Sequence, residues 1–282
     1  FDVCLAGMAE VAYEIKDYAE VIVASQRTEP GSGYPYDAIL TTLKTNAQTY
    51  TAEQLGTLIV DEYYNSTSGD NSTQAAYRTS RMSNLKTAID NFADAICSAN
   101  IWSEIRTARE TIASNANGEN EEMDDGDDDG DNSGIDLYHF AELLSATSNA
   151  GVNSAASNLK NEISQFLIRF KKHYTTSDYA NPGPDWNGIA IFLPNENYNP
   201  VHDKAIAFGR DSSWTKFLRY YRTSMDGSGA GEPIELIMNP IQDLVADAAV
   251  TVEWYSAYDG NGLLNYRLTQ FKGVDLLFSE NF

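Results

Sequence analysis

The first 25 residues constrain the fold more than any other part of the chain. Residues 1–3 are predicted to end a buried strand, and apolar residues at helical spacing predict a helix over residues 8–15. A β-branched run at residues 20–25 then predicts a second strand. A strand, a helix and a strand in succession are typical of a βαβ unit. The sequence therefore predicts an α/β domain with a mostly parallel sheet.

Cys4 lies between the first predicted strand and the predicted helix. Ligands of open α/β sheets bind at the carboxyl ends of the strands, and a thiol near a helix N-terminus is favoured as a nucleophile by the helix dipole. Free cysteines are also commonly buried and unreactive, so position alone leaves both interpretations open. A loop rich in Gly and Pro, residues 26–36, leaves the same predicted sheet edge and is placed to form a pocket wall.

The charge of the chain restricts its partners. A formal net charge of −22 argues against nucleic acid and suits a cationic ligand or substrate. No apolar run is long enough to span a bilayer. The two cysteines, Cys4 and Cys97, do not make a disulfide framework, and nothing supports a bond between them. Cys97 lies on the apolar stripe of a predicted helix, so we interpret it as structural.

The remaining pattern predicts a large domain at residues 1–224 and a small β-rich region at residues 233–282. A Gly-rich segment at 225–233 resembles a linker, and alternation at 250–255 and 264–268 around a turn predicts a hairpin. Helices are predicted near residues 37–43, 51–65, 83–97, 101–114, 135–144, 152–172 and 214–221, and further strands at 79–85 and 188–194.

An acidic tract at residues 119–136 contains ten carboxylates and no Lys or Arg. Its spacing matches an EF-hand loop in which Asp replaces the terminal Glu. The predicted Ca²⁺ ligands are Asp125, Asp127, Asp129, Asp131 and Asp136. Acidic runs match such a pattern easily, so a solvated insertion is the alternative interpretation.

Several segments resemble the clostripain-like cysteine peptidases, which are caspase- and gingipain-like enzymes of clan CD. The resemblance covers roughly residues 1–222 and is most specific in the first forty. It implies a caspase-like three-layer sandwich, a catalytic domain at residues 1–224 and cysteine endopeptidase activity with Cys4 as the nucleophile. It implies no cofactor for the chemistry, although calcium dependence is known in the family. The matching segments are residues 2–8, 10–14, 23–25, 28–34, 188–194 and 214–218.

The family's catalytic His precedes the Cys, in a His-Gly motif at the end of an earlier strand. None of His139, His173 and His202 stands in such a motif. Family members are typically cut into a light chain with the His and a heavy chain with the Cys. The resemblance therefore implies that this is a heavy chain, tightly associated with a light chain that supplies the His. It also implies a secreted or cell-surface location in a bacterium.

The resemblance assigns a pocket for the substrate residue before the cleaved bond, P1. The family's Asp two residues before the nucleophile lines this S1 pocket and pairs with Arg or Lys, and Asp2 matches it. Residues i and i+2 of a strand share a face, so Asp2 and Cys4 are expected side by side. Glu29 and Asp37 have alternative roles as a turn carboxylate and a helix N-cap. The predicted substrate-binding residues are Asp2, Ser25, Glu29, Ser32 and Asp37.

A phosphatase and a binding module are the two alternatives to the peptidase. A phosphatase needs Cys-x5-Arg, but the sixth residue after Cys4 is Glu10, which excludes that chemistry. A catalytically inactive binding or adhesion module is the alternative that stays open. Its surface ligand would be held by aromatic residues of the C-terminal region, although cross-strand aromatics are often plain packing. These residues are Trp254, Tyr255, Tyr258 and Tyr266.

Overall fold

The computed structural model describes residues 1–68, 71–113, 134–173, 185–194, 205–225, 267–272 and 275–281. The chain divides into two units, Phe1–Leu218 and Arg219–Phe282. In the second unit, β6 (Arg267–Lys272) pairs antiparallel with β7 (Asp275–Asn281). The predicted hairpin strand at 250–255, most of the linker and the four C-terminal aromatic residues lie outside the described residues.

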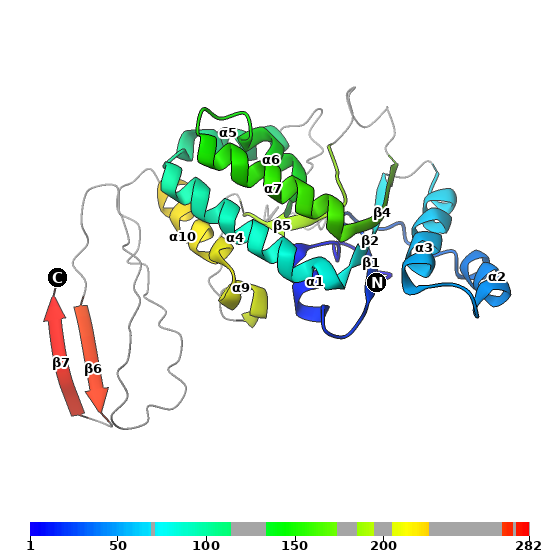
Figure 1. The fold of residues 1–282 in the computed structure, drawn as a ribbon, viewed down its shortest axis with the longest axis horizontal. Coiled ribbons are helices and arrows are strands. Elements are labelled where there is room, and N and C mark those ends of the chain that lie inside the picture. The colour runs from blue at the N-terminus through cyan, green and yellow to red at the C-terminus, as the bar shows by residue number, and fades with distance from the viewer. Residues whose placement is uncertain are drawn as a thin grey trace. The chain divides into compact units, whose positions relative to one another are not determined.

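The first unit alternates helices with short strands (Figure 1). Its helix α10 continues into the second unit. In chain order the elements are α1 (Ala9–Ile15), β1 (Val21–Ala24), α2 (Tyr36–Asn46), α3 (Ala52–Ser66), β2 (Ser72–Arg78), the 3₁₀ turn η1 (Thr79–Arg81), α4 (Met82–Ala99), α5 (Trp102–Ala113), β3 (Gly134–Asp136), α6 (Leu137–Leu144), α7 (Ala150–Phe166), β4 (Leu167–His173), β5 (Ala190–Phe192), α9 (Ala207–Asp211) and α10 (Ser213–Met225).

The strand directions differ from the expected mostly parallel sheet. Among the described residues, β1, β2 and β4 form an antiparallel sheet in the order β1-β2-β4, and β3 pairs antiparallel with β5. The parallel contact is an isolated bridge between Met8 and Ala190. Two helices, α2 and α3, connect β1 to β2. Parallel strands are usually joined by a crossover of one helix, and this two-helix connection between antiparallel strands departs from that unit.

The predicted strand at residues 1–3 is also wrong, because these residues lie outside any strand. The chain instead turns at Cys4 and Leu5, and Leu5 has a left-handed φ of 61°. Residues 5–8 then link the two sheets. The amides of Leu5 and Gly7 donate to the carbonyls of Arg27 and Ser25, just after β1, and Ala190 of β5 donates to the Gly7 carbonyl. Cys4 therefore lies next to the segment where the two sheets meet.

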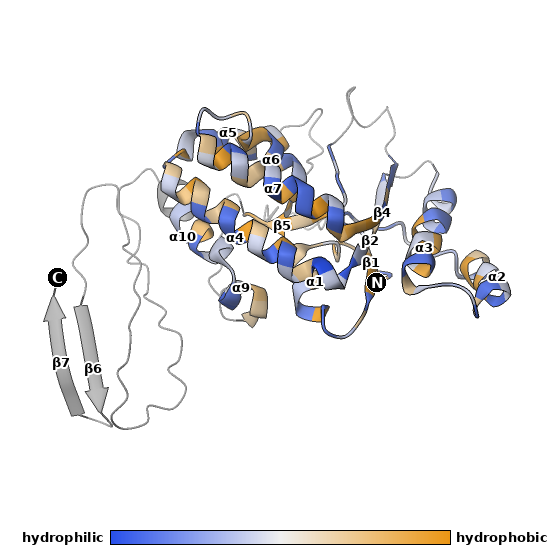
Figure 2. Cartoon of the chain, in the orientation of Figure 1, coloured by the Kyte–Doolittle hydropathy of each residue, from blue (hydrophilic) through white to orange (hydrophobic). Residues whose placement is uncertain are grey.

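Helices pack on both faces of the β1-β2-β4 sheet, which gives three layers (Figure 1). On one face, Val60 of α3 packs with Val23 and Ala76. On the other face, Tyr77 of β2 stacks on Phe166 of α7 with ring centroids 5.1 Å apart. Helices α4 and α7 pack against each other, and both mix hydrophobic and hydrophilic residues along their length (Figure 2). Their apolar stripes are buried, as the helical spacing predicts.

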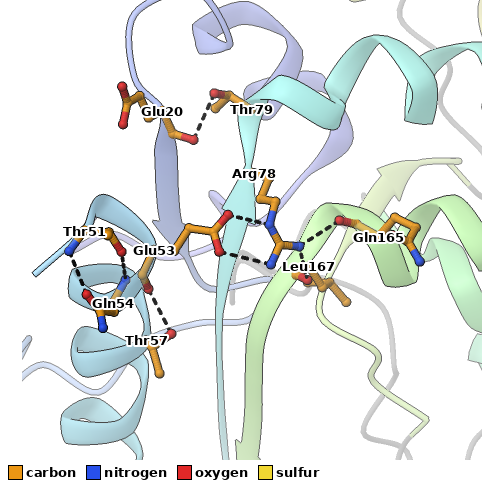
Figure 3. A network of polar contacts seen from close by, with 9 residues as sticks. All are labelled: Glu20, Thr51, Glu53, Gln54, Thr57, Arg78, Thr79, Gln165 and Leu167. Atoms are coloured by element: carbon orange, nitrogen blue, oxygen red, sulfur yellow. Dashed lines mark hydrogen bonds and ion pairs between the residues drawn. The ribbon is translucent and has the colours of Figure 1, made fainter.

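Most predicted helices are confirmed, including the start of α3. Thr51 caps α3 in a reciprocal capping box with Gln54, shown in Figure 3. The prediction missed strands β2, β3, β4 and β7. The strand predicted at residues 79–85 is a 3₁₀ turn and the start of α4, and β2 precedes it. The helix predicted over residues 152–172 ends at Phe166, where β4 begins.

Arg78 joins three elements at the end of β2 (Figure 3). Its guanidinium forms a two-pronged ion pair with Glu53 of α3 and donates to the carbonyls of Gln165 and Leu167, where α7 meets β4. Two parallel N–H···O bonds hold a carboxylate more firmly than one. These contacts hold α3 and β4 against the C-terminal end of β2.

Candidate active site

Cys4 is exposed, and its sulfur is held by the loop that follows β1. The backbone N–H of Glu29 donates to Cys4 Sγ over 3.3 Å. Helix α1 begins only at Ala9, after Met8 as its N-cap. The dipole effect predicted for this thiol therefore finds no support, because that effect fades beyond the first turn of a helix. The loop amide, rather than the helix, positions the sulfur.

Two carboxyl groups meet beside Cys4. Asp2 lies close enough to Glu29 for its charge to raise the pKa of Glu29, and Tyr36 donates to Asp2 Oδ2 over 2.9 Å. The pKa of Glu29 is raised to about 7, mainly by burial; the Gln74 hydrogen bond opposes this rise and the neighbouring Asp2 charge adds to it. The hydrogen bond to Asp2 also raises the pKa of Tyr36. This cluster is an acidic site whose negative charge a bound cation would neutralise.

One oxygen of Glu29 has a donor and the other does not. Gln74 Nε2 donates to Glu29 Oε1 over 3.0 Å, whereas Oε2 is buried with no donor. Two ionised carboxylates this close repel each other, and a proton on Glu29 relieves that repulsion. A proton or an incoming cation can therefore fill the same gap.

Gly33 fits this site closely. Its φ is +64°, and a Cβ added there would lie 3.0 Å from Asp2 Oδ2. A turn closed by the Gly33 N–H on the Pro30 carbonyl, at 3.0 Å, brings the loop back beside Asp2. A side chain at Gly33 would have to adopt a left-handed backbone and displace the carboxylate.

The variant Gly33→Ala is expected to lower the free energy of unfolding by about 1–2 kcal/mol, because alanine is strained at a left-handed φ. Gly31→Ala is the matched control, since a Cβ there meets nothing within 4 Å and its φ is not in the left-handed region. Urea denaturation of both variants measures the difference. Equal stability of the two variants would contradict the close fit at Gly33.

The other predicted substrate-binding residues are not brought into this cluster. Ser25 is fully buried, and its hydroxyl bonds to Thr73 Oγ1 over 3.0 Å and accepts from the Arg27 amide. Ser32 is exposed in the loop. Asp37 is exposed in the first turn of α2, where Pro35 rather than Asp37 is the N-cap. Asp2 and Glu29 are therefore the predicted pocket residues that meet.

The described histidines are engaged elsewhere. Nε2 of His139 lies 3.7 Å from Asp185 Oδ2, and His173 stacks on Tyr64 and contacts its carbonyl. His202 lies outside the described residues. Within the described ranges, no imidazole hydrogen-bonds to the Cys4 sulfur.

Of the predicted calcium ligands, Asp136 lies among the described residues, and the others lie outside them. Asp136 is buried and caps α6 by accepting from the His139 amide over 2.8 Å. Its oxygens also accept from Gln26 and from both nitrogens of Asn187. Burial raises the pKa of Asp136, while these four donors oppose that rise. A metal ion would have to displace donors that already occupy both oxygens. Among the described residues, no group of three His, Cys, Asp or Glu side chains could hold a metal ion.

Cys97 is less exposed than Cys4. Both thiols are free, but burial raises the pKa of Cys97 to about 12. A thiol that stays protonated is a weak nucleophile. This supports the structural role predicted for Cys97.

Comparison with known proteins decides the family. The Clostripain family, peptidase family C11, matches residues 1–230. The chain belongs to the clostripain family. It is 29% identical over 226 residues to clostripain from Hathewaya histolytica, a match that covers 69% of this chain and 42% of that protein. The chain thus spans less than half the length of this relative. The predicted family of cysteine peptidases, which are hydrolases, is confirmed.

Solved structures of the clostripain family share the fold. A B. fragilis cysteine protease has a TM-score of 0.52 at 15% identity, over 76% of this chain and 86% of its own. An inactive zymogen C11 protease from Parabacteroides distasonis has a TM-score of 0.51 at 18% identity, over 75% and 57%. A secreted C11 protease from Bacteroides thetaiotaomicron, solved with an irreversible peptide inhibitor, has a TM-score of 0.51 at 16% identity, over 77% and 58%. The predicted caspase-like α/β fold class is confirmed.

The sequence did not predict three residues of the hydrogen-bond network around Asp2 and Glu29. Tyr34 and Tyr36 lie in the loop, where the neighbouring Pro and Gly residues indicate only a turn. Gln74 lies on β2, in a polar stretch without strand periodicity.

The described helices include none long and apolar enough to cross a membrane.

Proposed function

We propose that this chain is the nucleophile-bearing part of a cysteine endopeptidase that cleaves peptides after Arg or Lys. The observation that carries the proposal is the pair of carboxyl groups, Asp2 and Glu29, beside the exposed Cys4 thiol. An Arg or Lys side chain would bind between these two carboxyl groups and donate to both. The backbone carbonyl of the same Arg or Lys would then lie at Cys4. The net charge of −22 favours a cationic substrate further.

The chemistry would proceed in two steps at Cys4. The sulfur attacks the carbonyl carbon of the basic residue, and an imidazole takes the thiol proton and gives it to the leaving amine of the next residue. Water then hydrolyses the thioester with the same imidazole as base. The backbone N–H of Cys4 and a second amide near the imidazole would stabilise the oxyanion.

The imidazole would come from a separate light chain of the same precursor. Phe1 and Val3 flank Asp2 in the chain, and Tyr36 hydrogen-bonds to it. Their exposed apolar side chains, with that of Leu40, would suit a partner chain. Tyr36 and Leu40 are four residues apart on α2, so they share a face. A secreted or cell-surface location is part of the proposal and is supported by the secreted relative from Bacteroides thetaiotaomicron.

The substrate preference is tested with matched peptides that carry Arg, Lys or norleucine before the cleaved bond. Asp2→Asn is expected to lower kcat/KM for the basic peptides by about 10²-fold, because one charge-assisted contact is lost, and to change norleucine cleavage little. Asp17→Asn, which removes an exposed charge paired with Lys16, is the control for the overall field. Equal cleavage of all three peptides by the wild type would contradict the basic preference. No cleavage at all would favour a binding or adhesion module.

The basic preference is also expected to depend on pH through Glu29. Its pKa is raised to about 7, so Glu29 is protonated below that pH and becomes a carboxylate above it. The ratio of kcat/KM for Arg over norleucine should therefore rise as pH increases through 7, while titration of the nucleophile and base cancels in the ratio. In Glu29→Gln the ratio should be flat with pH. A ratio that falls as pH rises would contradict this role of Glu29.

A further inference from the structure

Gln74 makes contacts that a core residue on a central strand does not need. It lies on β2, the middle strand of its sheet, and is 1% exposed. Its side chain shares a face with that of Ala76, two residues on, which packs in the apolar cluster under α3. An apolar residue would serve that packing equally well, so the amide calls for another explanation.

Both N–H groups of the Gln74 amide are directed to the site. Nε2 donates to Glu29 Oε1 and to the Tyr34 hydroxyl, each over 3.0 Å. Tyr34 in turn donates to the Phe1 carbonyl over 2.5 Å. Gln74 therefore holds the loop carboxyl and, through Tyr34, the segment that carries Asp2 and Cys4.

The oxygen of the same amide is buried without a partner. A buried unpaired oxygen is unfavourable, and methionine at this position would avoid it at similar volume. The amide is oriented by its two acceptors, because turning it over would place its oxygen against the Glu29 carboxyl. The chain thus retains a destabilising amide at this position, and the hydrogen bonds of that amide go to Glu29 and Tyr34.

We propose that Gln74 is a positioning residue for the pocket that binds the basic side chain. It fixes Glu29 through Oε1, so that Oε2, which has no donor, is left for the guanidinium or ammonium group of the substrate. This inference rests on the proposed function, because it assumes that Asp2 and Glu29 bind Arg or Lys. Gln74 acts on substrate only through Glu29 and Tyr34.

A double-mutant cycle on the protein made from its complete gene tests this role. Gln74→Met is expected to raise KM for Arg and Lys peptides about tenfold with little change in kcat, because Glu29 loses its donor. In the Glu29→Gln background the same change should raise KM less than about twofold, since residues that act as a unit are not additive.

Thr79→Val is the matched control for a purely structural effect. Thr79 follows the C-terminal end of β2, and its buried hydroxyl shares its proton between the carbonyls of Ala19 and Glu20. Figure 3 shows the contact with Glu20. The Thr79→Val variant should have a lower melting temperature than the wild type and the same KM. If Gln74→Met fails to fold, Gln74→Glu keeps the shape and puts a carboxyl beside Glu29. The pH midpoint of the Arg-to-norleucine ratio should then move upward.

The outcomes separate the two proposals. A wild type that does not cleave after Arg or Lys contradicts the proposed function and this inference with it. A wild type that does, with the same KM increase from Gln74→Met in both backgrounds, contradicts the inference alone. An unchanged KM in Gln74→Met, or an unmoved midpoint in Gln74→Glu, also overturns it.

Discussion

Replacing Cys4 by alanine is expected to lower kcat/KM for an Arg or Lys peptide by about 10⁵-fold. Alanine has no nucleophile, and the residual rate would come only from substrate binding and oxyanion stabilisation. The effect should lie in kcat, with KM nearly unchanged, because the acidic pair of Asp2 and Glu29 is left intact. Release of a fluorogenic leaving group from the protein made from its complete gene measures both constants.

Cys97→Ala is the control for this prediction. Cys97 is a free thiol whose pKa burial raises to about 12, so its loss should leave the rate of cleavage unchanged. Iodoacetamide should modify the exposed Cys4 and inactivate the protein, with Cys97 unmodified in the same time. Substantial cleavage by Cys4→Ala, or inactivation that follows modification of Cys97, would show that the nucleophile is elsewhere.

The largest loss of stability is expected from Asp136→Ala, about 3–5 kcal/mol. The change leaves two buried donors, Gln26 Nε2 and the His139 amide, and the partly buried Asn187 amide without their acceptor, while Asn187 Nδ2 keeps its bond to the Asp185 carbonyl. Each buried donor left unpaired costs about 1–3 kcal/mol, although relaxation recovers part of the sum. Helix α6 also loses its N-cap, which contributes about 1 kcal/mol. Urea denaturation measures the free energy of unfolding.

Asp136→Asn and a chelator make this prediction specific. The asparagine oxygen can still accept from part of the donors, so its loss of stability should be intermediate. The loss in Asp136→Ala should be equal with and without EDTA, because the donors are protein groups. A loss that is seen only with Ca²⁺ present would instead favour the EF-hand interpretation of the acidic tract.

The helices of this chain could be predicted because their signals are local. The apolar stripe of α4 and the Thr51 capping box need only neighbouring residues, and the structure has both. Strand β2 could not be found in the same way. Its sequence, Ser-Thr-Gln-Ala-Ala-Tyr-Arg, is buried on both faces but has no apolar alternation. Its polar groups are satisfied by distant partners such as Ser25 and Glu29, which no local pattern shows.

By itself, the sequence determined the family, the fold class and the Cys4 motif, because these depend on residues close together in the chain. It also placed Asp2 and Glu29 among the pocket residues, through the resemblance of the first forty residues. Only the tertiary structure decided which predicted acids meet. It buried Ser25, left Asp37 on the surface and brought Gln74 from 45 residues beyond Glu29 to hold its carboxyl. The physical reason is that hydrogen-bond partners in a core are chosen by strand pairing across the sheet, and that pairing is not written in local periodicity.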